Sequence, residues 1–277
     1  MKLSNFEKNI QSQFGEDGVI EEIFNNIENK NFYCVEFGAW DGIYLSNTWN
    51  LWHNHDWSSL LIEGNDSKMK ELEENIKKFS KVKALNAFVS PKGKYSLDQI
   101  LPQFNVPINL DLLSVDIDGD EYYIFESLEL YRPKLIILEY NPTIPPHIEL
   151  VQSVGEYMGC SALALIKLGK KKQYRAVHIT TTNIFFLTDE IFEKGEFIEI
   201  DLVKDFKYDF LVSVITSYDG ISYLSDRLPY LPEIPPKQTP TIFRLIKNLF
   251  KRSDKQTNKI PSFNSKAELI PVELFKK

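Results

Sequence analysis

The sequence is poor in cysteine and in long apolar runs, and each shortage limits what the protein can be. Its two cysteines, Cys34 and Cys160, form no pattern of metal ligands, and the apolar residues around them predict buried free thiols. No apolar run approaches the roughly 18 residues that a membrane-spanning helix requires. The polar N-terminal residues are not followed by the apolar core of a signal peptide, so we expect a cytoplasmic protein.

Acidic residues outnumber basic ones outside the C-terminal tail. The formal net charge is −7, but the segment from Lys237 to Lys277 holds ten Lys and Arg against three Asp and Glu. That segment therefore carries +7, which leaves −14 for the rest of the chain. A general nucleic-acid binder presents a basic face to phosphates, so the acidic body argues against nucleic acid and favours a small or neutral acceptor.

Five apolar, β-branched runs predict the strands of a sheet, and helix-like or turn-rich stretches separate them. This alternation indicates an α/β fold with a parallel sheet covered by helices on both faces. Two further runs, Tyr174 to Ile179 and Asn183 to Thr188, predict a closely connected antiparallel pair that completes the sheet. The five runs are Phe32 to Phe37, Ser58 to Ile62, Val82 to Val89, Leu110 to Val115 and Lys134 to Tyr140; helices are expected at Gly15 to Ile27, Ser67 to Phe79, Glu121 to Leu128 and Ile148 to Lys170.

The chain is expected to contain one main domain and two appended parts. Residues 1–190 form the domain, residues 191–236 an irregular extension that packs on it, and residues 237–277 a basic amphipathic helix with a loosely ordered tail. In that helix Ile242, Leu245, Ile246 and Leu249 form one apolar stripe. Such a stripe suits contact with an anionic membrane surface, with the protein's own domain, or with the second subunit of a homodimer.

The turn after the first predicted strand, Glu36 to Gly42, is the strongest candidate for a ligand site. In open parallel sheets, ligands bind at the carboxyl ends of the strands where the winding direction reverses. The spacing of Gly38 and Gly42 does not match the dinucleotide pattern Gly-x-Gly-x-x-Gly, and no Lys-Ser/Thr pair for a triphosphate follows; both observations count against NAD and ATP. The second predicted strand ends in Glu63, whose carboxylate can accept hydrogen bonds from both ribose hydroxyls of a nucleoside.

Five short segments between residue 12 and about residue 145 form a recognisable combination: Ser12-Gln-Phe-Gly-Glu-Asp17-Gly18, Val35-Glu-Phe-Gly-Ala-Trp-Asp-Gly42, Ser46-Asn-Thr48, Leu61-Ile-Glu-Gly64 and Ser114-Val-Asp-Ile-Asp118-Gly119. In this order they resemble the FkbM family of bacterial methyltransferases. The resemblance implies a Rossmann-like class I methyltransferase fold and S-adenosylmethionine as the cofactor. It also implies O-methylation of a sugar or other small hydroxylated metabolite, in glycan or secondary-metabolite biosynthesis.

The resemblance also implies where the cofactor binds. Glu36 suits the cationic amino group of the cofactor, and Gly38 and Gly42 leave room for its carboxylate. Glu63 is the expected ribose ligand, and Ala87 with Phe88 would lie beside the adenine. The expected cofactor-binding residues are Glu36, Gly38, Ala39, Asp41, Gly42, Glu63, Gly64, Ala87, Phe88 and Asp116.

The reaction centre is expected at the ends of the fourth and fifth strands. Because the methyl group is already activated, the protein mainly has to orient the acceptor and remove its proton. Asp116, Asp118, Glu139 and Asn141 offer hard oxygen ligands that suit Mg²⁺, which would lower the pKa of an acceptor hydroxyl. A base without metal is the alternative, with Asp116, Asp118 or His147 as the candidates.

Other interpretations of these residues stay open. The segment from Asp118 to Asp120 could simply turn the chain and cap the helix expected near Glu121. At the level of the whole protein, the alternative to an enzyme is a non-catalytic protein that keeps the fold and recognises a glycan or a partner. A nicotinamide-dependent enzyme is a third possibility, which the glycine spacing disfavours.

Overall fold

The computed structural model describes residues 1–28, 30–216, 218, 222–225, 270 and 271. The chain divides into two units, Met1–Asp209 and Phe210–Lys277. The second unit contains a three-stranded antiparallel sheet of β8 (Val214–Thr216), β9 (Ser222–Leu224) and β10 (Ile270–Pro271). Among the described helices, none combines the length and the hydropathy needed to cross a membrane. The stripe predicted from Ile242 to Leu249 lies outside the described residues.

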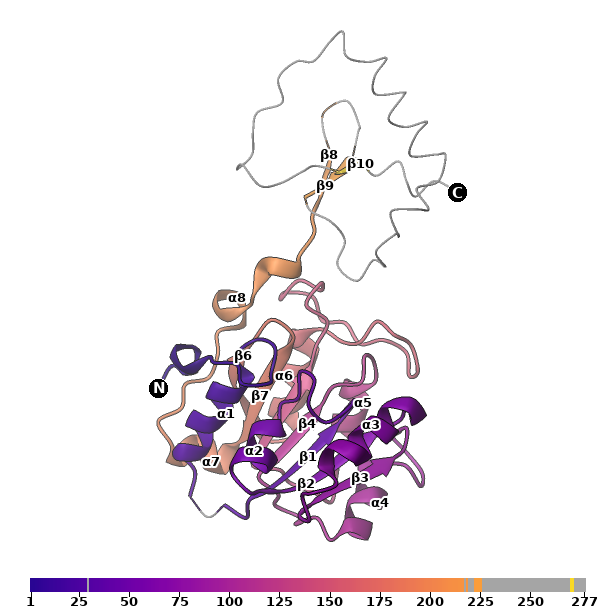
Figure 1. The fold of residues 1–277 in the computed structure, drawn as a ribbon. Coiled ribbons are helices and arrows are strands. Elements are labelled where there is room, and N and C mark those ends of the chain that lie inside the picture. Colours follow the sequence, from indigo (N-terminus) through magenta and orange to yellow (C-terminus); the bar gives the residue numbers. More distant parts are fainter. Residues whose placement is uncertain (29, 217, 219–221, 226–269, 272–277) are drawn as a thin grey trace. The chain divides into compact units, whose positions relative to one another are not determined.

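The first unit is built on a seven-stranded sheet in the order β3-β2-β1-β4-β5-β7-β6 (Figure 1). The first five strands are parallel, and β7 runs antiparallel to both of its neighbours. This arrangement confirms the predicted Rossmann-like fold of class I methyltransferases, and the winding direction reverses between β1 and β4. The strands are β1 (Tyr33–Phe37), β2 (Ser58–Glu63), β3 (Val82–Asn86), β4 (Leu112–Val115), β5 (Leu135–Glu139), β6 (Tyr174–Ile179) and β7 (Asn183–Thr188).

Helices cover both faces of this sheet, because its strands are apolar on both sides. Helices α1, α2 and α3 contribute to one core cluster, while α5 and α6 pack against each other on the opposite face (Figure 1). The α-helices are α1 (Glu16–Asn25), α2 (Trp49–Asn54), α3 (Asp66–Ile76), α4 (Leu97–Ile100), α5 (Glu121–Ser127), α6 (Ala162–Lys171), α7 (Asp189–Lys194) and α8 (Leu202–Asp205), with 3₁₀ turns η1 (Leu3–Phe6), η2 (Leu101–Phe104) and η3 (Tyr208–Phe210).

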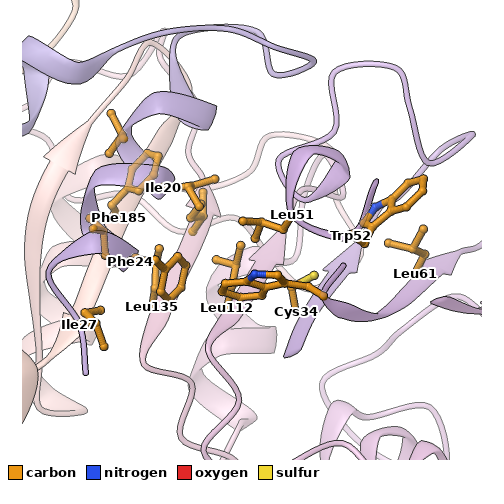
Figure 2. Packing of buried hydrophobic residues seen from close by; sticks show 14 of the residues in the cluster. Ile20, Phe24, Ile27, Cys34, Leu51, Trp52, Leu61, Leu112, Leu135 and Phe185 are labelled. Carbon is orange, nitrogen blue, oxygen red and sulfur yellow. The ribbon is translucent and has the colours of Figure 1, made fainter. Parts of the chain in front are cut away.

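Two consecutive phenylalanines of β7 show how the two cores are separated. Phe185 belongs to the cluster around α1, whereas the ring of Phe186 lies 5.9 Å from that of Phe125 in α5. Successive side chains of a strand point to opposite faces, so these fully buried rings anchor β7 in both layers. Figure 2 shows the first core, in which side chains of α1 and α2 lie over the central strands.

One predicted helix is wrong, and the short helices α2, α4, α7 and α8 were not predicted. The helix expected from Ile148 to Lys170 begins only at Ala162, where Ser161 caps it by accepting a hydrogen bond from the amide of Ala164 at 3.2 Å. Within the preceding loop, Gly155 and Gly159 have φ angles of 82° and 70°, which an α-helix does not contain. Helix α2 was not predicted, because its aromatic residues resemble strand or loop as much as a short helix.

The predictions for the antiparallel pair and for the two cysteines are confirmed. β6 and β7 have the predicted bounds. Cys34 and Cys160 are both free and buried. Burial raises the pKa of Cys34 to about 12 and also raises that of Cys160, so neither is an activated nucleophile.

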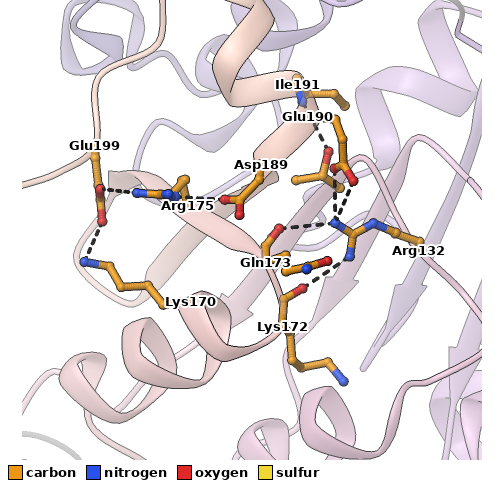
Figure 3. A network of polar contacts seen from close by, with 10 residues as sticks. Arg132, Lys170, Lys172, Gln173, Arg175, Asp189, Glu190, Ile191 and Glu199 are labelled. Carbon is orange, nitrogen blue, oxygen red and sulfur yellow. Dashed lines mark hydrogen bonds and ion pairs between the residues drawn. The ribbon is translucent and has the colours of Figure 1, made fainter.

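A polar network joins the end of α6 to α7 (Figure 3). Arg132 donates to the carbonyl oxygens of Lys172 and Gln173 at 3.2 and 3.3 Å and pairs with Glu190 at 3.1 Å. Arg175 donates to Asp189 at 2.8 Å. These charges are partly exposed, so solvent screens each pair and weakens its contribution to stability. The network satisfies backbone carbonyl oxygens at the C-terminal end of α6. None of its residues lines the cavity at the carboxyl ends of the parallel strands.

Candidate functional site

A cavity of about 480 Å³ opens at the carboxyl ends of the central parallel strands. Its walls come from the segments that follow β1, β2, β3 and β4, together with part of the loop before α6. It therefore lies at the position where the strand order predicts a ligand site. The lining residues are Glu36 to Trp40, Tyr44 to Asn47, Glu63, Gly64, Phe88, Val89, Asp116 to Asp120 and Gly155 to Tyr157.

Gly38 is required by the close approach of two strand ends. Its φ angle is +79°, and a Cβ atom there would lie 1.6 Å from the carbonyl oxygen of Asp116. The amides of Gly38 and Ala39 both donate to the carbonyl oxygen of Ile62 at 3.1 Å, which ties the turn to β2. This part of the cavity lining is therefore bare backbone held between β2 and β4.

The second glycine of the turn has a different role. Gly42 has a φ angle of +78°, but a Cβ atom there would meet the side chain of Leu72 in α3 at 2.6 Å. Asp41 accepts hydrogen bonds from the amides of Ile43 and Tyr44 at 2.9 and 2.7 Å. Neither Gly42 nor Asp41 lines the cavity, so both shape the turn from behind.

Glu36 lines the cavity, but its carboxylate is engaged by the chain itself. One oxygen accepts from the amide of Asn47 at 2.7 Å, and the other accepts from the hydroxyls of Ser46 and Thr48 at 2.6 and 2.7 Å. Burial is the main cause that raises the pKa of Glu36 to about 7, and the three hydrogen bonds oppose it. Glu36 thus holds the turn from Ser46 to Thr48 against β1, a role that sequence reasoning did not assign.

Glu63 stands at the end of β2, beside the same turn. Its two carboxylate oxygens accept from the amides of Trp40 and Asn65, at 2.8 and 2.6 Å. A carboxylate has about four acceptor sites, so each oxygen of Glu63 keeps one for a ligand. Gly64 follows it in the lining.

The segment after β3 contributes an exposed ring. Phe88 lines the cavity and is 77% exposed, and a Cβ atom on Gly64 would lie 2.5 Å from that ring. Ala87 is buried and does not line the cavity. Of the pair expected beside an adenine, only Phe88 is therefore in position to contact a ligand.

Three acids gather at the ends of β4 and β5. Three carboxylate oxygens, one from each side chain, lie within 4.8 Å of one another; they belong to Asp116, Asp118 and Glu139. Asp116 faces the cavity, yet surrounding protein excludes enough water to raise its pKa to about 6. Burial and the nearby charge of Asp116 raise the pKa of Glu139 well above its usual range.

The other predicted residues of this rim do not join the three acids. The amide oxygen of Asn141 accepts from the backbone and hydroxyl of Thr143 at 2.9 and 2.6 Å, and its nitrogen donates to the carbonyl of Met158. His147 is exposed and does not line the cavity. His178 is buried in β6, where it lies 3.3 Å from the carboxylate of Glu7, and it does not line the cavity.

The loop from Gln152 to Gly159 forms a wall that sequence reasoning missed. Asp120 accepts from the side-chain amide of Gln152 and from the backbone of Gly155, both at 2.9 Å. The carbonyl oxygen of the buried Gln152 side chain accepts from the amides of Met158, at 2.7 Å, and of Gly159. These bonds brace the loop across the end of β4. The two glycines, Gly155 and Gly159, were the available signal.

Two buried acids lie outside the cavity, and one of them, Glu121, supports its wall. Glu121 accepts from the amides of Ile117 and Gly119 at 2.9 and 3.0 Å, and burial raises its pKa to about 7. Glu16 accepts from the hydroxyl of Thr180 at 2.8 Å and thereby joins the N-terminal segment to the β6–β7 connection. The turn from Asp118 to Asp120 thus precedes α5 as predicted, but the side chain of Asp120 does not cap the helix. The amides of Ile117 and Gly119 donate to Glu121 instead.

No family model and no curated protein matches the chain, so membership of the FkbM family stays a prediction. Solved structures with a related arrangement include the CMeT domain of the citrinin polyketide synthase, at 12% identity and a TM-score of 0.44 over 62% of this chain and 50% of that domain. A SAM-dependent methyltransferase from Aquifex aeolicus matches at 12% identity and 0.40, over 66% of this chain and 94% of that one. The N-terminal domain of EvdMO1, solved with SAH and D-fucose, matches at 11% and 0.41 over 62% of this chain and 80% of that one.

The chain spans about half the length of the citrinin synthase domain and most of the other two. Identities and TM-scores of this size carry no information about activity.

Proposed function

We propose that this protein is an S-adenosylmethionine-dependent methyltransferase that methylates a hydroxyl of a sugar or other small hydroxylated metabolite. The observation that carries the proposal is the hydrogen bonding of Glu63. Its carboxylate is fixed by two backbone amides beside the glycine turn, and it keeps one acceptor site on each oxygen. Two adjacent hydroxyls, as in a ribose, satisfy that arrangement.

The rest of the lining suits the other parts of the donor. The bare backbone at Gly38 and Ala39 accommodates the methionine portion, and the exposed ring of Phe88 offers a face for the adenine. Asp116 and Asp118 border the same cavity and supply proton acceptors for the hydroxyl. In the transfer, the hydroxyl oxygen bonds to the methyl carbon, the carbon–sulfur bond breaks with its electron pair going to sulfur, and the proton passes to a carboxylate.

Calorimetric titration with S-adenosylmethionine and S-adenosylhomocysteine tests the cofactor assignment. We expect binding of both, and binding of neither would refute the proposal. The role of Glu63 is tested by changing the ligand rather than the protein, so that the fold is not altered. Because a hydrogen bond to a charged group is worth about 1.5 to 3 kcal/mol, 2′-deoxyadenosine and 3′-deoxyadenosine should each bind at least about tenfold more weakly than adenosine. Equal affinities would contradict the ribose assignment.

The acceptor class needs a turnover assay. Methyl-labelled donor is incubated with neutral monosaccharides and polyols, and the products are identified by mass spectrometry. Donor binding together with an O-methylated product supports the proposal. Donor binding with no product from any hydroxylated acceptor favours the non-catalytic alternative.

A further inference from the structure

The lining of the cavity carries charge of one sign only. It contains six carboxylates and, among the described residues, no Lys, Arg or His. The carboxylates belong to Glu36, Glu63, Asp116, Asp118, Asp120 and Glu156. A ligand with a positive centre is therefore attracted at this site, and an anionic one meets no compensating charge.

Four of these acids are occupied by the chain's own amides and hydroxyls. Glu36, Glu63 and Asp120 each accept two or more hydrogen bonds, as described above. Glu156 accepts from the amide of Ser153 at 3.3 Å. These carboxylates maintain the walls of the cavity, and their capacity for a ligand is reduced accordingly.

Asp118 differs from these four acids. Within the described part of the chain, no hydrogen-bond donor reaches its carboxylate, which is exposed at the cavity. Its backbone has a φ angle of +58°, in the left-handed region, and a Cβ on the adjacent Gly119 would lie 2.6 Å from the carbonyl oxygen of Glu156. The turn is thus held by its surroundings. The carboxylate of Asp118 lies within 4.8 Å of those of Asp116 and Glu139 and accepts no hydrogen bond from the described residues.

We propose that Asp118 recognises the positive charge on the sulfur of the methyl donor, so that the cavity binds the charged donor more tightly than its neutral product. The proposal rests on the function proposed above. S-adenosylmethionine carries a sulfonium, whereas S-adenosylhomocysteine has a neutral thioether and is otherwise nearly identical. Loss of this attraction on transfer weakens the hold on the product and favours its release.

Three ligands separate charge from shape. S-adenosylmethionine carries a sulfonium, sinefungin carries an ammonium at the equivalent position, and S-adenosylhomocysteine is neutral there. We expect the two cationic ligands to bind the full chain about tenfold more tightly than the neutral one, a factor typical of one partly hydrated charge interaction. Calorimetry at low ionic strength measures this, with chelator present so that no divalent cation screens the acids. Added salt should reduce the ratio.

The variant Asp118→Asn removes the charge and keeps a residue that tolerates the left-handed conformation. It should weaken S-adenosylmethionine and sinefungin about tenfold and change S-adenosylhomocysteine by less than about twofold. Glu73→Gln, on the exposed side of α3, makes the same change in net charge away from the cavity and should leave all three affinities unaltered. Equal wild-type affinities for the three ligands would overturn the inference, as would an equal loss of all three in Asp118→Asn. Failure of every ligand to bind would instead overturn the proposed function.

Discussion

Ionisation of Glu36 should destabilise the protein as the pH rises from about 4.5 to about 7. The folded state raises the pKa of this carboxyl from 4.5 to about 7, chiefly because it is buried. A folded pKa above the unfolded one means that the folded state holds the proton more tightly. The resulting stability is fully present below the unfolded pKa and is lost as the pH rises through the folded one.

The size of the effect follows from the shift. One pKa unit corresponds to about 1.4 kcal/mol, so the difference between 4.5 and about 7 is worth about 3 kcal/mol. The variant Glu36→Gln resembles the protonated side chain in shape and cannot ionise. Its amide group can still meet Ser46, Asn47 and Thr48, because two of these three partners are hydroxyls that rotate.

Urea unfolding of the wild type and Glu36→Gln, followed by tryptophan fluorescence from about pH 4.5 to about pH 8, measures this difference. The stability of the variant relative to the wild type should increase across the range by about 3 kcal/mol. Other buried acids titrate in both proteins and cancel in the comparison. Glu73→Gln, with its exposed side chain, should show no pH-dependent difference. A constant difference between wild type and Glu36→Gln at all pH values would refute the argument.

Three further predictions concern the walls of the cavity. Gly38→Ala should unfold the turn or lower stability by more than about 2 kcal/mol in thermal melts, because its Cβ would meet the carbonyl oxygen of Asp116. Gly93→Ala is the control, because Gly93 has a φ angle of +80° but nothing within 4 Å of its Cβ position. It should lose only about 1 kcal/mol of stability in the same melts. Gln152→Ala should accelerate hydrogen exchange at the amides of Met158 and Gly159 while Gln99→Ala does not; unchanged protection would show that Gln152 does not brace the loop. The Mg²⁺ hypothesis predicts a calorimetric binding isotherm that Glu139→Gln abolishes, and absence of heat in the wild type would contradict it.

Hydrophobic periodicity was sufficient to predict the sheet. Strands of a sheet covered on both faces are apolar throughout, and β6 and β7 were placed to the residue because short polar turns bound them. The loop before α6 misled the same reasoning. Its Leu150, Val151 and Val154 suggest a helix, but the positive φ angles at Gly155 and Gly159 depend on bonds to Gln152 and Asp120 that no local pattern encodes.

The position of the cavity was predictable from the sequence, but the hydrogen bonds made by its residues were not. The glycine turn and the acids at the strand ends were recognisable because the fold brings the carboxyl ends of parallel strands together. The turn after β1 then adopts positive φ at Trp40 and Leu45 as well as at its glycines. Those conformations bring the hydroxyls of Ser46 and Thr48 within hydrogen-bonding distance of Glu36. The partners are ten or more residues apart in the sequence, so hydrophobic periodicity does not reveal the contact.

Glu36 and Glu63 look equivalent in the sequence, since each is an acid at the end of a parallel strand. Their hydrogen bonds distinguish them. Of about four acceptor sites on a carboxylate, Glu36 uses three and Glu63 uses two. Glu36 can therefore accept at most one more hydrogen bond, whereas Glu63 can accept one on each oxygen. We therefore propose that Glu63 rather than Glu36 recognises a diol, and a loss of nucleoside affinity in Glu36→Gln should be smaller than the loss on removing either ribose hydroxyl from the ligand.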